Sequence, residues 1–472
     1  MERKLEKSLN KNVNSFNELL GAQDSFDIIQ RKFKMGGREA CFYFVDGFAK
    51  DEVLQKIMQY LEDKKPEDIP KNIEEISNQL IPYGEVDLRN QLDDMCKDLL
   101  SGISILLIDG FDWAIAMDSR TYPARGVEEP EKDKTLRGSR DGFVETIVFN
   151  TALIRRRIRD PKLTMQIMSV GSASKTDVVV SYMKGRVDTK LLNYITKKIE
   201  DIQIDALTMN QESLAECLYR GSGWNPFPKF KYTERPDAAA ASILEGSIVI
   251  LVDNSPSAMV IPSTIFDIIQ EADDYYFPPV TGTYLRISRM IMSVIAMLLT
   301  PTFVLLMQRP EFIPGWLGFI KVEDTVNVPL VLQFIILEFA IDGLKLASVN
   351  TPDMLSTPLS VVAGIVLGDY TVQSGWFNAE VMLYMAIVAI SNYTQASFEL
   401  GYAIKLFRIV TLILTGVFGL YGYIAGILFT VLSIVFTKTL AGKSYLYPLI
   451  PFNGRKLWRM FFRTSLPKSE GK

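Results

Sequence analysis

Two carboxylates stand inside a segment that is otherwise long and apolar, and they are the first candidates for chemistry. Glu338 and Asp342 lie in the stretch 328–347 and are four residues apart, so a helix places them on one face. A charge at the centre of a bilayer costs about 2.5–3.5 kcal/mol, so such residues usually face water or an opposite charge. If several copies surround a pore, the two carboxylates line it as a ring that attracts cations. Alternatively, one carboxylate lies at the membrane interface or pairs with Lys345.

The residue types that are missing or scarce exclude several kinds of site. The chain contains no histidine, which rules out a Ser-His-Asp triad, His-ligated zinc and histidine proton shuttles. Its three cysteines, Cys41, Cys96 and Cys217, are far apart and odd in number. This pattern is typical of free thiols that behave as small buried hydrophobes in a reducing compartment.

Two glycine-containing segments fall short of nucleotide-binding motifs. The Gly-Lys-Ser at Gly442 lacks the glycine that a P-loop needs five residues earlier, where Thr437 stands. The segment 221–226 lacks the third glycine of a dinucleotide fingerprint. Acidic pairs such as Asp273-Asp274 are typical of solvated loops. We therefore expect no enzyme activity, no cofactor and no metal site.

A charged segment in the first half of the chain combines a turn with a basic helix. It contains twelve notable positions: Gly138, Arg140, Asp141, Gly142, Phe143, Glu145, Asn150, Leu153, Ile154, Arg155, Arg156 and Arg157. Opposite charges beside a glycine, followed by three arginines on a predicted helix, suit a subunit-contact surface, because arginine binds carboxylates through two parallel hydrogen bonds. An internal ion-pair network that links two subdomains is the alternative.

This signature segment, residues 138–157, resembles the most recognisable stretch of the GerA-type spore germination proteins, the A-subunit family. The order of parts along nearly the whole chain is also similar. The resemblance implies a spore inner-membrane protein that assembles as a homo-oligomer, a pentamer, into a channel for monovalent cations during germination. Residues 42–58 are more similar to an accessory sporulation paralogue than to a nutrient-receptor A subunit. That role would be to amplify ion release, together with other spore membrane germination proteins.

Other functions remain open at this point. The chain could be the A subunit of a nutrient germinant receptor, in which recognition is assigned mainly to a B subunit. It could also be a secondary transporter, although the apolar region looks short for the paired broken helices of that class. A germination scaffold that conducts nothing is the third alternative.

The chain changes character near Arg286. Up to that residue there are 37 Lys/Arg and 45 Asp/Glu, and after it 14 and 10. We therefore expect an α/β soluble head of two mixed α/β subdomains, followed by an all-α transmembrane bundle. The expected parts are an N-terminal arm (1–36), a first subdomain (37–124), a second subdomain with the signature (125–284), the transmembrane domain (285–437) and a basic tail (438–472).

Periodicity places the elements of the head. Strands are expected at 40–46, 163–171, 177–184, 243–254 and 258–262, and a hairpin at 103–118. Helices are expected at 51–61, 88–100, 146–159, 191–204 and 213–220.

Apolar stretches in the second half predict about four to six spans, because a crossing needs roughly 20 residues. The candidates are 286–308, 328–347, 358–368 and 378–395, and the 29 residues between Arg408 and Lys438. That last stretch is one tilted helix or a tight hairpin.

Charge also predicts the orientation. The tail from Lys438 carries eight Lys/Arg against one Glu, which favours the cytoplasmic side, as do Arg286 and Arg289 before the first span. Head and tail would both be cytoplasmic, with an even number of crossings and no signal peptide or nucleic-acid partner. Aromatic residues among the tail cations, Trp458, Phe461 and Phe462, predict a segment lying on the anionic inner leaflet.

Overall fold

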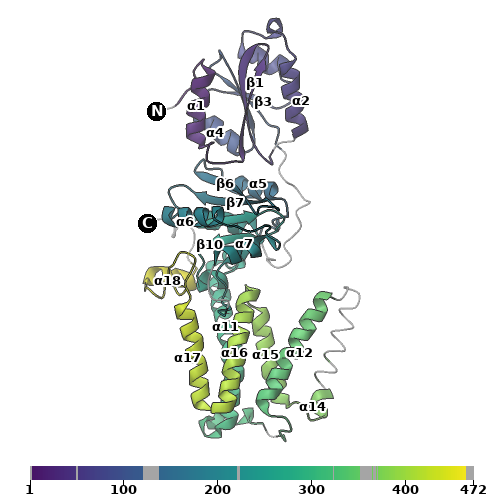
Figure 1. Ribbon diagram of the computed structural model, residues 1–472, viewed down its shortest axis with the longest axis vertical. Helices are drawn as coiled ribbons and strands as arrows, with labels where there is room; N and C mark the ends of the chain where they lie inside the picture. The colour runs from purple at the N-terminus through teal and green to yellow at the C-terminus, as the bar shows by residue number, and fades with distance from the viewer. Residues whose placement is uncertain are drawn as a thin grey trace. The chain divides into compact units, whose positions relative to one another are not determined.

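The computed structural model describes residues 3–48, 51–120, 138–219, 224–322, 324–350, 364, 368 and 370–463. The chain forms two compact units. The first comprises Met1–Arg220 and Phe230–Pro262, and the second comprises Gly221–Lys229 and Ser263–Lys472. Each unit has its own core and is described by itself (Figure 1).

The first unit begins with a five-stranded antiparallel sheet in the order β1-β2-β4-β5-β3. Its strands are β1 Ile28–Met35, β2 Arg38–Val45, β3 Val86–Arg89, β4 Ser104–Ile108 and β5 Ala114–Met117. Helices α1 Leu9–Leu20 and α4 Leu92–Leu100 cover one face, and α2 Asp51–Glu62 and α3 Ile73–Glu75 cover the other. Short turns of helix lie at η1 Pro66–Asp68 and η2 Ile76–Leu80.

Successive side chains of β2 point to opposite faces of this sheet and contribute to the core on each face. Cys41 and Tyr43 pack against α1 and α4, whereas Phe42 packs against α2. Burial raises the pKa of Cys96 to about 12 and also raises that of Cys41, so both thiols stay protonated and behave as apolar groups. None of the three cysteines forms a disulfide.

Two expectations for this region were wrong. Residues 1–36 are not an arm, because they contain α1 and β1 and contribute to the core. Leu9, Val13, Phe16 and Leu20 recur at helical spacing and are buried, but the polar residues between them obscured the pattern. The helix expected at 88–100 begins only at Leu92, since Val86–Arg89 pairs with β5 as an edge strand.

A second five-stranded antiparallel sheet completes the first unit, in the order β6-β7-β9-β10-β8. Its strands are β6 Leu163–Val170, β7 Thr176–Met183, β8 Lys231–Thr233, β9 Ile248–Val252 and β10 Ala258–Ile261. Helices α5 Ile147–Arg157 and α8 Pro236–Leu244 share one core with the sheet. Helix α6 Thr189–Glu200 contacts β6, and α7 Asn210–Leu218 contacts β9. The strand expected from residue 243 starts at Ile248, because Ile243 is a core residue of α8, which ends at Leu244.

The second unit is helical. Its long elements are α11 Pro279–Gln308, α12 Leu330–Asn350, α15 Ala379–Tyr393, α16 Phe398–Phe418 and α17 Leu420–Phe436. Short helices are α9 Ile265–Ile269, α10 Asp273–Tyr276, α14 Thr371–Gln373, α18 Gly454–Phe461, η3 Pro310–Phe312 and η4 Gly315–Ile320. By length and composition, α11 and α16 could each cross a membrane, and α15 and α17 are shorter apolar helices. The number of crossings therefore stays a prediction. Apart from 364 and 368, the candidate span at 358–368 lies outside the described residues.

The stretch after Arg408 is a hairpin, so the single tilted helix was wrong. Helix α16 ends at Phe418, and Gly419, with φ +58°, reverses the chain into α17. The two helices pack closely, since a Cβ on Gly422 would lie 1.8 Å from the Leu414 carbonyl oxygen. A side chain at Gly426 would meet Thr411 at 2.7 Å. Small residues thus bring the two helix backbones together.

Candidate functional site

A cluster of four charged side chains lies between α12 and α16. It consists of Glu338 and Asp342 on α12 and Lys405 and Arg408 on α16, and these four residues are called the charge cluster below. Each pair spans about one helical turn, so two carboxylates on one helix face two cations on the other. The remaining residues of these helices are mainly apolar.

The deepest contact joins Glu338 and Arg408. The guanidinium is fully buried, and its Nη2 and Nε lie 2.6 and 2.8 Å from Oε1 of Glu338, which is 3% exposed. Arg408 also donates from Nη1 to the Ala296 carbonyl oxygen on α11 at 2.5 Å. The ion pair therefore joins three helices. Sequence reasoning placed Arg408 at the edge of a span, whereas it lies in the middle of α16, because that helix begins ten residues earlier at Phe398.

Lys405 connects the two carboxylates. Its Nζ lies 3.2 Å from Oε2 of Glu338 and 2.5 Å from Oδ2 of Asp342, and it donates to the Glu338 carbonyl oxygen at 3.1 Å. Asp342 was expected to have Lys345 as an alternative partner, but the structure pairs it with Lys405. Burying charges is costly unless each has an opposite partner and good hydrogen bonds. In the charge cluster, each charge has an opposite partner within the same chain.

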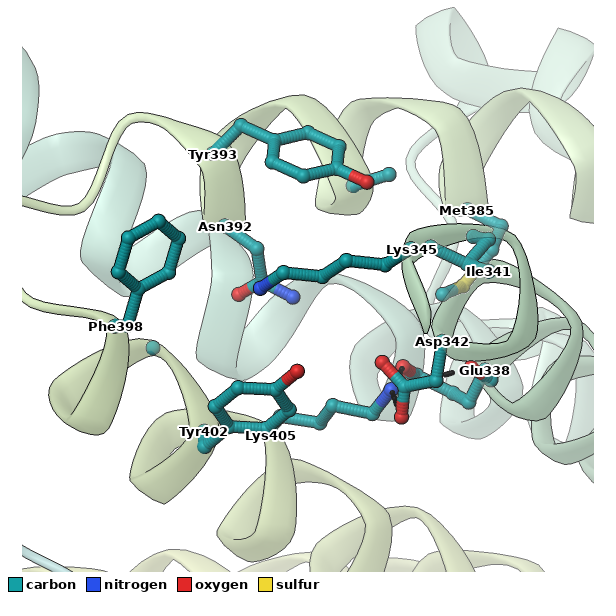
Figure 2. A pocket seen from close by; sticks show the side chains of 12 residues that line it. Glu338, Ile341, Asp342, Lys345, Met385, Asn392, Tyr393, Phe398, Tyr402 and Lys405 are labelled. Atoms are coloured by element: carbon teal, nitrogen blue, oxygen red, sulfur yellow. Dashed lines mark hydrogen bonds and ion pairs between the residues drawn. The ribbon is translucent and has the colours of Figure 1, made fainter. Parts of the chain in front are cut away.

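Asp342 lines a small, partly open hollow at the edge of the charge cluster, with a cavity volume of about 40 Å³ (Figure 2). Its side chain is 31% exposed, against 3% for Glu338. Lys345 extends across the hollow, and its Nζ lies 4.6 Å from the Phe398 ring centre and 4.7 Å from that of Tyr402. Of the two carboxylates, Asp342 is the one that solvent or an ion can reach.

A second buried cluster lies where α11 begins. Asp274 of α10 is fully buried, and its Oδ2 lies 3.2 Å from both Arg286 Nε and Arg289 Nη1. Glu271 binds Arg289 Nη2 at 2.8 Å. The expectation of a solvated loop charge was wrong for Asp274, because the two arginines one turn apart on α11 enclose it. Arg286 also donates from Nη1 to the carbonyl oxygens of Arg459 and Met460, at 3.1 and 3.4 Å.

The approach of α10 to α11 requires a glycine. A Cβ added at Gly282 would lie 2.2 Å from the Asp274 carbonyl oxygen, whereas one at Gly343 in α12 would meet nothing within 4 Å. We expect Gly282→Ala to destabilise the protein by about 1–3 kcal/mol through overpacking. The matched change Gly343→Ala should be neutral or stabilise by up to about 1 kcal/mol through helix propensity. Thermal unfolding in detergent measures the stability of both variants. Equal changes in stability would show that α10 does not pack tightly against α11 at Gly282.

The signature segment is divided between internal and exposed positions. Arg155 is fully buried in the first unit, and its Nε lies 2.7 Å from Oδ2 of Asp27. Its Nη2 donates to the other Asp27 oxygen, to Ser25 Oγ and to the Leu163 carbonyl oxygen, each at 3.1 Å. Ser25 and Asp27 directly precede β1, and Leu163 begins β6. Arg155 thus ties the entry of the first sheet to the start of the second.

Two further signature residues also form contacts inside the chain. Arg157 binds Asp141 at 2.5 Å. Burial alone would raise the pKa of Asp141, but hydrogen bonds from Arg157 and Ser139 outweigh it and hold this pKa below its usual value. Asn150 is buried. Its Oδ1 accepts from the Val144 amide at 2.8 Å, and its Nδ2 donates to the Val144 carbonyl oxygen at 2.5 Å. These bonds hold the loop against the start of α5.

The other signature residues lie elsewhere. Gly142 is buried, whereas Arg140, Glu145 and Arg156 are exposed. Glu145 accepts a hydrogen bond from Asn254 through its carbonyl oxygen at 2.8 Å, which leaves its carboxylate at the surface. The exposed three are the signature side chains that another subunit could reach. The partners Asp27, Lys405 and Arg408 were missed from the sequence. The one hint at Lys405 and Arg408 was that they lie about one helical turn apart, as do Glu338 and Asp342.

Comparison with known proteins identifies the family. The profile described as Bacillus/Clostridium GerA spore germination protein matches residues 14–472. This chain belongs to the GerA family. The family member named stage V sporulation protein AF, from Bacillus subtilis (strain 168), is 36% identical over 459 residues, which cover 97% of this chain and 92% of that protein. The resemblance seen in the signature segment is confirmed.

This GerA-family chain is also similar to a second curated protein and to one solved structure. The uncharacterized membrane protein YfkQ of the same organism is 28% identical over 446 residues, covering 93% of this chain and 85% of that protein. Among solved structures, the N-terminal domain of the A subunit of the Bacillus megaterium spore germinant receptor GerK3 is 28% identical. It has a TM-score of 0.43 and covers 56% of this chain and 97% of its own.

Proposed function

We propose that this chain is a subunit of an oligomeric, pentameric channel in the spore inner membrane that releases monovalent cations during germination. Membership of the GerA family supports a role in germination. The similarity to stage V sporulation protein AF favours a part accessory to nutrient receptors over that of a receptor A subunit. Helices α11 and α16 are long and apolar enough to anchor such a protein in a bilayer. We assign it no catalytic step.

The charge cluster is the observation that carries this proposal. Charged residues among apolar helices are expensive and are typical of ion pathways or buried pairs. Glu338 is shielded by Arg408 and Lys405, which suits it to holding α12 against α16. Asp342 reaches the hollow and, among the described residues, pairs with Lys405. Of the two candidate pore-lining residues, we therefore place Asp342 on the cation path and Glu338 behind it.

Asp342→Asn is expected to lower potassium flux several-fold in vesicles that contain the purified protein, because it removes a negative charge that draws cations toward the hollow. Glu311→Gln, at an exposed carboxylate of the same unit, is the matched control and should leave the flux unchanged. Unchanged flux in Asp342→Asn would remove this residue from the path. Wild-type vesicles that conduct nothing would favour a germination scaffold, and solute uptake driven by an ion gradient would favour a transporter.

Assembly is tested separately from conduction. Size-exclusion chromatography with light scattering should give the mass of a ring of identical subunits in detergent, and a strictly monomeric mass would overturn the channel. If exposed signature residues form the subunit contact, Arg140→Glu should shift the population toward monomers, because it replaces attraction with like-charge repulsion. Lys190→Glu, at an exposed lysine of α6, is the control. Intact rings in Arg140→Glu would restrict the signature segment to an internal role.

The proposed topology is multi-pass, with an even number of crossings and with both the first unit and the tail in the cytoplasm. The basic residues of the tail support this orientation. Single cysteines introduced at Lys190 and Arg455, in a protein with its native cysteines replaced, should react with an impermeant reagent from the cytoplasmic side. Labelling of the two positions from opposite sides would require an odd number of crossings.

A further inference from the structure

Helix α18 is a short amphipathic helix that exposes basic and aromatic side chains. Arg455, Lys456 and Arg459 form one face, because they fall within about 100° of the helix circumference at 100° per residue. Leu457, Trp458 and Phe461 lie on the other side. None of the eight residues of α18 is buried.

The aromatic side of α18 is only partly covered. Phe461 packs edge-on against Phe266, with ring centres 6.3 Å apart. Trp458 is 59% exposed and stacks on Phe462 at 4.1 Å. Phe452, just before the helix, is 74% exposed. Large aromatic side chains beside a basic face are typical of helices that lie in the interfacial layer of a membrane.

The basic face has no acidic partner among the described residues. Arg455 and Arg459 form no ion pair there, and the ammonium of Lys456 lies over the Tyr447 ring at 5.3 Å. Three neighbouring cations that repel one another at the surface are stabilised by an external anionic surface. The partner that covers α18 must therefore carry negative groups next to an apolar layer.

The rest of the unit holds α18 in place at both ends. Asn453 caps its start by accepting from the Lys456 amide at 3.1 Å, and buried Arg286 caps its end through the carbonyl oxygens of Arg459 and Met460. The Arg463 amide, just after the helix, donates to Thr283 Oγ1 of α11 at 3.1 Å. Isolated helices this short are unstable in water, so these caps keep the helix formed. They hold α18 beside the first turns of α11, at one end of that apolar helix.

We infer that α18 is a membrane-interface helix that binds anionic phospholipid, with Arg455, Lys456 and Arg459 on the headgroup phosphates and Trp458 and Phe462 at the edge of the acyl region. This lipid contact does not depend on ion conduction. It would fix the start of α11, through Arg286 and Asp274, to the surface of the bilayer.

The test uses full-length protein in nanodiscs made of phosphatidylcholine with or without phosphatidylglycerol. Trp458 is made the sole tryptophan by changing Trp113, Trp224, Trp316 and Trp376 to phenylalanine. Lipids brominated near the glycerol end of the acyl chain should then quench its fluorescence more strongly than lipids brominated near the methyl end. Aqueous iodide should quench it weakly. If brominated lipids at neither depth quench Trp458, then water or protein covers this face, and the proposal is overturned.

The lipid preference is measured by counting the lipids that stay bound in native mass spectrometry. A basic residue near an anionic surface contributes about five-fold. The triple change Arg455→Gln, Lys456→Gln and Arg459→Gln should therefore lower the preference for phosphatidylglycerol by up to about a hundred-fold. The control Lys56→Gln, Lys71→Gln and Lys190→Gln removes as many exposed cations from the first unit and should leave it unchanged. The triple Gln variant keeps Asn453, Arg286 and the ring contacts of Trp458 and Phe461. An unchanged elution profile shows that it is folded. An equal preference in both triple variants would overturn the assignment.

Discussion

Arg408→Met is expected to lower the free energy of unfolding by about 3–5 kcal/mol, because it leaves the Glu338 carboxylate buried beside one remaining cation. Arg408 is fully buried and also holds the Ala296 carbonyl oxygen of α11, so its loss affects three helices. Denaturation of the purified protein in detergent, followed by circular dichroism, measures the change. Cross-linking between cysteines placed on α12 and α16 would report whether these two helices separate.

A double variant separates the cost of an unpaired charge from the value of the pair. Glu338→Leu with Arg408→Met removes both charges and leaves Lys405 with Asp342 at 2.5 Å. Replacing a whole buried ion pair by apolar residues is often neutral or stabilising, so the double variant should regain most of the lost stability. If it is as unstable as Arg408→Met alone, then the arginine acts mainly through packing and through Ala296, and the charge argument is wrong.

Arg155→Met is expected to have an effect of similar size in the first unit, about 3–5 kcal/mol. Asp27 is 1% exposed. Removing the guanidinium leaves its carboxylate, among the described residues, with Ser25 Oγ as a side-chain partner. Hydrogen exchange should rise at both ends of this contact, in the segment before β1 and at the start of β6. The reason is that Arg155 bonds to Asp27 and to the Leu163 carbonyl oxygen at the same time.

The matched control is Lys190→Met, at an exposed lysine of the same unit, and it should change stability by about 0.5 kcal/mol or less. A small effect of Arg155→Met, or an increase in exchange confined to one of the two segments, would contradict the view that this arginine joins the two sheets. Arg155→Lys offers a graded case. A lysine keeps the charge but cannot form the paired bonds to Asp27, so an intermediate loss is expected.

The fold of the first unit was largely predictable where local patterns are strong. The alternation in β2 and the hairpin β4–β5 mark buried strands whatever lies around them, and both were placed correctly. The pattern failed for α1 and β1, where polar residues outnumber the few that reach the core. It also failed at β3, a four-residue edge strand whose partner lies 25 residues or more along the chain. A short strand of this kind has no signal of its own.

The candidate site was half predictable. Glu338 and Asp342 are conspicuous because a charge in an apolar stretch stands out locally. The sequence does not show that Asp342 pairs with Lys405 or that Lys345 lies over two aromatic rings. Lys345 follows Asp342 by three residues on one helix, so helix geometry alone favours Lys345 as its partner. Asp274 looks like a loop charge until α10 is seen to pack on α11.

By itself, the sequence determined the family, the α/β character of the first unit and the apolar character of the second. These properties depend on residue types and on spacings of a few positions, which can be read along the chain. Only the tertiary structure decided which charges neutralise one another. Arg408 meets Glu338 across 70 residues and Arg155 meets Asp27 across 128. Such pairs form because two helix or strand faces pack together, and packing is a property of the whole fold.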